Sequence, residues 1–225
     1  MYQKNSGVAN AFADGPVMGR AAVESGRAMW YHYPNTEEGV RNMIQYRRLG
    51  EGKICRALFR GFRRRQVVTK CWRRENGAWV IRDDPFVDDW SEADYETLVS
   101  CLKNTIVTGG VVFAAFVDGA LKGFASVEGT LFGGENRYLD LTSIHVSEEA
   151  RGSGIGSALF RQAKEWAREH GAEKLYISAH SAVESQAFYR RMGCVEAQEY
   201  SREHTEAEPF DCQMECALNE AAQST

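Results

Sequence analysis

Residues 144–156, with the sequence IHVSEEARGSGIG, decide how this chain can be interpreted. An apolar, β-branched start is followed by three glycines within five residues and then by the helical spacing of Leu159, Ala163 and Trp166. Glycines let a backbone approach a ligand closely, and the free N–H groups and dipole at the start of a helix favour an anion. The stretch therefore predicts a strand, a phosphate-binding loop and a helix.

Three kinds of phosphate loop compete for this pattern. A Walker loop requires G-x-x-x-x-G-K-[ST], and no lysine follows the glycines here. A dinucleotide fingerprint would place Ser157 where Gly or Ala belongs, and the next strand, which ends in residues 178–180, supplies no acid for a ribose. A loop of the form R-x-x-G-x-G, beginning at Arg151, remains and would hold a pyrophosphate. The plain alternative is an ordinary turn between a strand and a helix.

The other elements are predicted from hydrophobic periodicity and turn residues. Strands are expected at residues 43–46, 111–117, 121–127, 138–146, 175–179, 195–200 and 212–218. Helices are expected at 54–65, from a capping box at Ser91 through Leu102, from 155 to a C-cap at Gly171, and at 185–192; a long connection precedes Trp90. The order is β-α-α-β-β-β-α-β-α-β-β, an α/β fold with a mixed sheet over residues 43–220. Residues 1–42 are expected to form a loosely ordered extension, and residues 221–225 a tail.

Composition and charge limit the possible partners. The chain is 44% hydrophobic and 26% charged, and it contains no run of the roughly 20 apolar residues that a membrane span needs. It has no basic-then-apolar start, so we expect a cytoplasmic protein without a membrane partner. The six cysteines include no C-x-x-C pair, so we expect reduced thiols and no metal site.

The net charge of −4 is unevenly distributed, because residues 41–82 carry 13 Lys and Arg against two acids. Such a basic segment could contact nucleic acid or phosphates. The ordinary interpretation is a solvated helix face beside acidic neighbours, and no nucleic-acid partner is expected.

Two motifs together resemble one family. Residues 144–156 are similar to the acetyl-CoA-binding motif of the GNAT N-acetyltransferase superfamily, with Val146 as the apolar residue five positions before Arg151. Residues 187–194, AFYRRMGC, resemble its second motif, a helix with Phe-Tyr followed by a glycine turn. The resemblance, to a bacterial small-molecule member, implies the GNAT acyl-CoA N-acyltransferase fold and acetyl-CoA as co-substrate. It also implies transfer of an acetyl group to a primary amine, with a small molecule favoured over a protein. A small polyamine, an amino-sugar antibiotic, a free amino acid and a protein N-terminus all stay open as acceptors.

The same resemblance implies which residues contact the coenzyme. The backbone at Ile144 and Val146 would bind the pantetheine arm and the thioester, and the glycine loop would wrap the pyrophosphate. Because the strands are expected to splay here, unpaired N–H and C=O groups would be available to the pantetheine amides. The predicted coenzyme-binding residues are Ile144, His145, Val146, Arg151, Gly152, Ser153, Gly154, Ile155, Gly156, Ser185 and Tyr189.

Acetyl transfer needs a polarised thioester carbonyl, a proton donor for the thiolate and a proton acceptor for the amine. Tyr189 matches the tyrosine of the family that donates to the sulfur. Asp140 lies eleven residues before Arg151, the offset of the catalytic glutamate in histone-type members, and Glu128 is an equal rival as base. His145 and His180 are strand-end residues near the same splay, and the base stays open at this point.

The acceptor is expected near the first two helices and the connection between them. Acids beside aromatic residues suit a cationic amine, although the same residues also anchor ordinary loops. They are Trp72, Trp79, Phe86 and Trp90, with Asp83, Asp84, Asp88 and Asp89. Two other functions remain: a non-catalytic acyl-CoA sensor, and a nucleic-acid-associated protein using residues 41–82. The terminal strands make a homodimer plausible.

Overall fold

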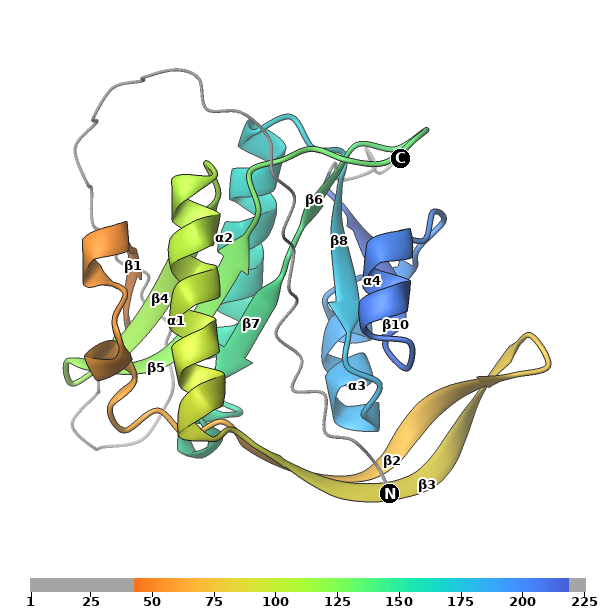
Figure 1. The fold of residues 1–225 in the computed structure, drawn as a ribbon, viewed down its shortest axis with the longest axis horizontal. Helices are drawn as coiled ribbons and strands as arrows, with labels where there is room; N and C mark the ends of the chain where they lie inside the picture. Colours follow the sequence, from red (N-terminus) through yellow and green to blue (C-terminus); the bar gives the residue numbers. More distant parts are fainter. Residues whose placement is uncertain (1–42, 219–225) are drawn as a thin grey trace, which may run out of the picture.

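The computed structural model describes residues 43–218 as a β-sheet split into two halves, with helices on both sides (Figure 1). The first half is antiparallel and has the order β1-β4-β5-β7. Its strands are Gln45–Arg48 (β1), Val111–Val117 (β4), Ala120–Val127 (β5) and Ser143–Val146 (β7). The second half has the order β6-β8-β10-β9, in which only β6 and β8 are parallel. Its strands are Tyr138–Asp140 (β6), Lys174–Ala179 (β8), Val195–Glu196 (β9) and Cys212–Ala217 (β10).

This arrangement confirms the predicted α/β fold with a mixed sheet. The hairpin predicted around the turn Asp118-Gly119 is also confirmed as β4 and β5. The extension at residues 1–42 and the tail at 221–225 lie outside the described residues. None of the helices within residues 43–218 is long and apolar enough to cross a bilayer.

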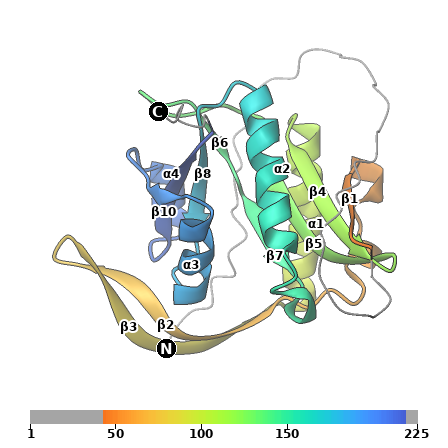
Figure 2. The ribbon, with the colours of Figure 1, turned by 180° about the vertical axis from the view of Figure 1, so that it is seen from behind.

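The strand predicted at residues 138–146 is two strands in the structure, and this difference opens the sheet. β6 pairs with β8 up to Asp140↔Tyr176, whereas β7 pairs with β5 in the other half. Leu141 and Thr142 lie between them, and the Leu141 N–H donates to the Tyr176 carbonyl at 2.9 Å. Beyond that bond β7 and β8 diverge (Figures 1 and 2), so that their facing edges have no ladder partner within residues 43–218.

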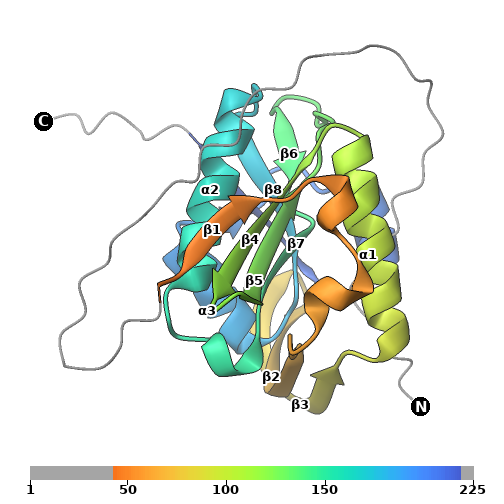
Figure 3. The ribbon, with the colours of Figure 1, turned by 90° about the vertical axis from the view of Figure 1, so that its left-hand side faces the viewer.

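Two long helices cover opposite faces of the first half-sheet (Figure 3). They are α1 (Glu92–Val107) and α2 (Ile155–Glu169). The β4 sequence VVFAAFV contains no polar side chain, as expected for a strand that is buried on both faces. Side chains alternate along a strand, so Phe113 packs in the core cluster with Leu159 of α2, and Val112 in the one with Leu98 of α1. The alternation therefore determines which helix each face of β4 contacts.

The capping box predicted at the start of α1 is confirmed. The Asp94 N–H donates to Ser91 Oγ, and the Ser91 N–H donates to the Asp94 carboxylate at 2.7 Å. We expect Ser91→Ala to lower the free energy of unfolding by about 1 kcal/mol, because the amides at the helix start lose their acceptor. Ser100→Ala is the matched control, since Ser100 is exposed on the same helix and bonds only along it, to the Glu96 carbonyl. Urea unfolding of both variants tests this, and equal stabilities would contradict it.

The prediction of a helix at residues 54–65 is wrong. The chain forms two short 3₁₀ turns instead, η1 (Glu51–Lys53) and η2 (Arg56–Phe59), and Gly61 follows with φ of +81°. A left-handed residue at this point is incompatible with a continuing helix. The apolar side chains that suggested a helical face, such as Phe62, anchor this irregular segment in the core beneath α1.

The prediction of a long connection before Trp90 is also wrong. This segment forms a β-hairpin of β2 (Arg65–Glu75) and β3 (Ala78–Asp89). Its turn is Asn76-Gly77, with φ of 49° and 84°, the residue pair that two-residue hairpin turns favour. The backbone N–H of Trp72 donates to the Ser181 carbonyl at 2.8 Å. The hairpin therefore runs beneath the opening between β7 and β8, next to the start of the following helix (Figures 1 and 2).

Two helices lie in the C-terminal part of the described chain. They are α3 (Val183–Arg191), which confirms the predicted helix at 185–192, and α4 (Arg202–Ala207). The strand predicted at residues 195–200 extends only over β9, and α4 was not predicted. Ser201 caps α4 by accepting from the His204 N–H, so a cap residue before a run of polar helix formers was the available signal.

Candidate active site

A groove of about 720 Å³ runs along β7, the glycine loop and the facing side of α3. It brings together the predicted coenzyme-binding residues apart from Ser153, whose hydroxyl donates to the Ala150 carbonyl within the loop itself at 2.6 Å. Those that line it are Ile144, His145, Val146, Arg151, Gly152, Gly154, Ile155, Gly156, Ser185 and Tyr189. The groove therefore begins at the opening of the sheet and ends at the start of α2.

The glycines of the loop are required by its backbone. Gly152 and Gly154 have φ of +79° and +85°, and Gly154 is the N-cap of α2. A side chain on Gly156 would meet the ring of Phe188 at 3.3 Å. The loop thus presents backbone N–H groups at the start of a fifteen-residue helix, where an anion is favoured.

Arg151 holds the loop in place with its side chain. Its Nη2 donates to the Arg65 carbonyl at 2.7 Å, and its Nε is 3.4 Å from the Val146 carbonyl. The guanidinium therefore connects the loop to the start of β2 and the end of β7.

A second, smaller cavity of about 80 Å³ lies on the other side of the opening. Five residues line both spaces: Arg64, Ile144, His145, His180 and Tyr189. The remaining lining of the small cavity is mostly polar and includes four acids: Asp88 from β3, Asp140 from β6, Glu208 after α4 and Asp211 before β10. His204 of α4 lies among them. The two spaces therefore meet along the five shared residues, which include Tyr189.

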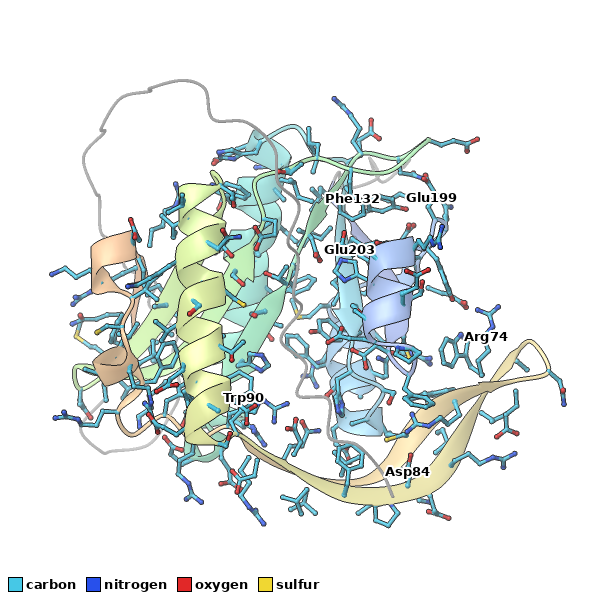
Figure 4. The ribbon with its side chains drawn as sticks, in the orientation of Figure 1. Arg74, Asp84, Trp90, Phe132, Glu199 and Glu203 are labelled. Carbon is cyan, nitrogen blue, oxygen red and sulfur yellow. The ribbon has the colours of Figure 1, made fainter. Side chains whose placement is uncertain are left out.

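The aromatic and acidic residues predicted to bind the acceptor separate in the structure. Trp90 and Asp88 line the small cavity, whereas the other six do not. Asp84 lies out along the hairpin, where it pairs with Arg73, and Trp90 lies at the base of α1 (Figure 4). Trp72 stacks with Arg190 at 4.3 Å and serves as a structural contact of the hairpin.

His145 and His180 are held as neutral rings that can only donate at Nε2. Nδ1 of His145 accepts from Arg64 Nε at 3.1 Å, and Nδ1 of His180 accepts from the Ala182 N–H at 3.2 Å. In each neutral ring the proton then lies on Nε2, as the partners dictate. Burial, and for His145 the adjacent Arg64 charge, lowers the pKa of both imidazoles. Neither ring has a free lone pair for an amine proton.

These two histidines predict a loss of stability in mild acid. Their folded pKa values lie below the ordinary value of about 6.5, so the unfolded chain binds protons that the folded chain excludes as pH falls from about 7.5 to 5.5. We expect these two rings to decrease the free energy of unfolding over this window, while His204, whose pKa is raised, contributes in the opposite direction. On acidification the free energy of unfolding should therefore be lost to a smaller extent in His145→Asn, whose amide oxygen can still accept from Arg64, than in the native protein. Urea unfolding at both ends of the window measures the slope, and an unchanged slope in the variant would contradict the assignment.

Asp140 and His204 form a buried pair within the small cavity. His204 Nε2 contacts Asp140 Oδ2 at 2.8 Å, and Asp140 is 7% exposed. Burial opposes a charge on His204, but the hydrogen bond and charge of Asp140, together with the charges of Glu208 and Glu203, outweigh it and raise the pKa of the imidazole. Asp140 Oδ1 has no hydrogen-bond partner within residues 43–218.

The two carboxylates predicted as rival bases therefore differ in position. Glu128 lines neither space, and its Oε1 accepts from Thr105 Oγ1 at 2.6 Å on the side of α1. Burial also raises the pKa of this carboxyl. Only Asp140 of the two lies in the cavity that meets Tyr189.

The cavity contains residues that the sequence analysis did not select. Arg64 pairs with Asp88 at 2.7 Å. Burial first, and then Glu208, raises the pKa of Asp211 well above its usual range. Arg64 could have been noticed only as part of a basic run, and His204, Glu208 and Asp211 belong to a region whose helix was not predicted.

The basic segment 41–82 faces acidic side chains from other parts of the chain. Arg63 and Arg65 both contact Glu148 at 3.3 Å, and Arg74 contacts Glu196 at 3.0 Å. These pairs agree with the ordinary interpretation of the charge asymmetry, although the described part of the segment forms strands and short 3₁₀ turns and contains no α-helix.

Comparisons with known proteins agree with this geometry. A streptothricin acetyltransferase of Streptomyces lavendulae is 40% identical over 82 residues, which is 36% of this chain and 41% of that protein, so the match spans less than half of the relative. The crystal structure of a nourseothricin acetyltransferase has a TM-score of 0.56 at 21% identity over 78% of this chain and 99% of that one. A protein assigned as a streptothricin acetyltransferase of Bacillus anthracis, in complex with acetyl coenzyme A, has a TM-score of 0.57 at 16% identity over the same shares.

The two crystal structures share the fold with this chain. The model of the acetyltransferase (GNAT) family matches residues 75–194, more than half of the chain, and includes the glycine loop and α3. This protein therefore belongs to the acetyltransferase (GNAT) family.

Proposed function

We propose that the protein transfers the acetyl group of acetyl-CoA to a primary amine of a small cationic molecule. The observation that carries the proposal is that two spaces meet along five shared residues, one of which is Tyr189. One is a long groove with a phosphate-binding loop, and the other is a small cavity with Asp140. Each space suits one of two substrates, and their junction is where an acetyl group would pass between them.

The coenzyme would lie in the long groove. Its pyrophosphate meets the backbone N–H groups of residues 152–156 at the start of α2, and its pantetheine amides pair with the free edge of β7. The thioester then reaches the junction between the two spaces. There a backbone N–H of β7 polarises its carbonyl in the manner of an oxyanion hole.

The amine attacks the thioester carbon directly. The new C–N bond forms as the C–S bond breaks, the amine loses one proton and the sulfur gains one. Asp140 Oδ1 accepts the amine proton, because it is a buried carboxylate oxygen of the small cavity with no hydrogen-bond partner within residues 43–218. Tyr189 donates a proton to the departing thiolate. Burial raises the pKa of its phenol, so the donor stays protonated, and the same burial disfavours a free thiolate.

The acceptor is proposed to be a cationic small molecule, with the streptothricin class as the first candidate. Support comes from the name of the relative in Streptomyces lavendulae and from the acids of the small cavity. Carboxylates in a partly closed space favour an ammonium group. An acyl-CoA sensor would need the groove alone, so the second cavity beyond Tyr189 favours the enzyme.

Two measurements test the proposal. Isothermal titration calorimetry should detect binding of coenzyme A to the folded protein. Release of free thiol from acetyl-CoA should then depend on an added amine, measured with streptothricin, polyamines, amino acids and aminoglycosides. Binding without amine-dependent thiol release would favour the sensor, and the absence of both would refute the proposal.

A further inference from the structure

The Nε2 end of the His145 ring is a hydrogen-bond donor without a partner where the groove and the small cavity meet. Nδ1 accepts from Arg64, so the proton of the neutral ring lies on Nε2. Within residues 43–218 Nε2 has no hydrogen-bond partner, and it is not one of the buried unpartnered atoms there, which are Arg64 Nη1 and Asp140 Oδ1. Nε2 therefore borders open space, and His145 lines both the groove and the small cavity.

The contacts of the ring hold it in one orientation and strengthen it as a donor. It lies on the α1 side of β7, with its centroid 4.7 Å from that of Trp90 and 5.3 Å from that of Phe124. Arg64 holds Nδ1 at 3.1 Å and is itself fixed by Asp88 at 2.7 Å. A charged donor on Nδ1 polarises the ring and makes Nε2–H a better donor. Burial and the same charge lower the pKa of the imidazole, so the ring stays neutral at pH 7.

We propose that His145 is a catalytic hydrogen-bond donor, whose Nε2–H binds the carbonyl oxygen of the thioester and stabilises the negative charge that develops there. This inference rests on the proposed function. As the amine nitrogen adds to the carbonyl carbon, the electron pair of the C=O π bond moves to the oxygen. It returns when the C–S bond breaks and Tyr189 protonates the sulfur. His145 keeps its proton throughout, and it acts beside the backbone N–H of β7.

The carbonyl oxygen is the reacting atom that needs such a donor. The attacking amine must keep its lone pair for the carbon, and its proton needs an acceptor, which a nitrogen that already carries hydrogen is not. The sulfur receives its proton from Tyr189. The oxygen alone gains negative charge that no side chain has yet been assigned to stabilise, and a fixed donor aimed at such charge is worth most because it needs no reorganisation during the reaction.

His180 has the same tautomer on the other side of the opening, because its Nδ1 accepts from the Ala182 N–H at 3.2 Å. Two differences assign the role to His145. His145 belongs to β7, the strand whose backbone is proposed to polarise the thioester, whereas His180 follows the end of β8. The partner of His180 Nδ1 is also a neutral amide, so this ring lacks a charged donor that would strengthen its Nε2–H.

Two substitutions separate the two ends of the His145 ring. In His145→Asn the amide oxygen takes the place of Nδ1, and no donor reaches the position of Nε2. In His145→Gln the amide nitrogen reaches that position. We expect His145→Asn to lower kcat by about a hundred-fold to a thousand-fold, the effect of one oxyanion donor, and His145→Gln to recover part of the loss. Glutamine would not rescue a general base, because an amide does not take up a proton at neutral pH.

Isotope-edited infrared spectroscopy of bound, carbonyl-labelled acetyl-CoA gives an independent readout. A hydrogen bond to the oxygen weakens the C=O bond, so the carbonyl should stretch at a lower wavenumber in the native protein than in His145→Asn. Binding of coenzyme A, which lacks the carbonyl, should be equal in native protein and variants by calorimetry, and this also shows that each variant is folded.

Native kcat and an unshifted carbonyl band in His145→Asn would overturn the inference while leaving the acetyltransferase intact. A fall in kcat without a band shift would also overturn it, since a purely structural role gives that result. The same would follow if His180→Asn, and not His145→Asn, lowered kcat and shifted the band. If the native protein acetylated no amine of any class, the proposed function itself would fail, and the inference with it.

Discussion

Asp140→Asn is expected to lower kcat by about a hundred-fold to ten-thousand-fold, the contribution of a positioned general base, while coenzyme A binds as before. Asparagine has nearly the same size as aspartate, and its amide oxygen can still accept from His204 Nε2. The amide cannot take a proton from the attacking amine. The loss should therefore appear in the chemical step, and a pre-steady-state measurement of acetyl transfer is the direct readout.

Glu128→Gln is the matched control for Asp140→Asn. Glu128 was the equal rival at the level of sequence, but its Oε1 bonds to Thr105 outside both cavities. We expect kcat to change little, with any effect confined to stability. A large loss in Glu128→Gln together with nearly native kcat in Asp140→Asn would reverse the assignment of the base.

Tyr189→Phe is expected to lower kcat by about a hundred-fold or more, because the departing thiolate loses its proton donor. The ring packs beside Phe188 and Phe160, with centroids 5.3 Å and 6.4 Å away, and phenylalanine preserves these contacts. Coenzyme affinity and stability should therefore stay close to native. Steady-state kinetics with acetyl-CoA and the best amine of the panel measure the effect.

Tyr200→Phe provides the matched control for the loss of a phenolic hydroxyl. Tyr200 is 42% exposed and bonds to Glu196 and Arg74 at the surface. Its kcat should equal that of the native protein. If kcat of Tyr189→Phe also equalled that of the native protein, Tyr189 would have no part in the transfer.

Local rules were sufficient where an element is defined by neighbours in sequence. The capping box at Ser91 depends only on Asp94 three residues later, and the hairpin turn depends only on the residue pair Asp118-Gly119. The same rules would have found the hairpin at Asn76-Gly77 and the cap at Ser201, whose signals lie in the sequence but were not used. Residues 54–65 differ, because their helical spacing of apolar residues is real but serves to anchor irregular turns, which only the core beneath α1 decides.

The division of residues 138–146 into two strands could not be read from periodicity. Both parts alternate and both are strands, but β6 pairs with β8 and β7 pairs with β5. The choice of partner is a long-range event, and it is the event that opens the sheet. Likewise, the position of Asp140 relative to Tyr189 depends on β8 and α3, which follow in the chain.

The sequence by itself indicated the family and predicted the glycine loop and Tyr189 as site residues, because each of these signals depends on a short run of residues with fixed local geometry. In the glycine loop, Gly152 and Gly154 have positive φ, and Gly156 lies too close to Phe188 for a side chain. Such positions favour glycine, so the residue type itself indicates the local geometry. Only the tertiary structure places Asp140, and not Glu128, in the small cavity together with Arg64 and His204. Those side chains come from distant segments, and their chemistry depends on which hydrogen bonds and burial the folded chain gives them.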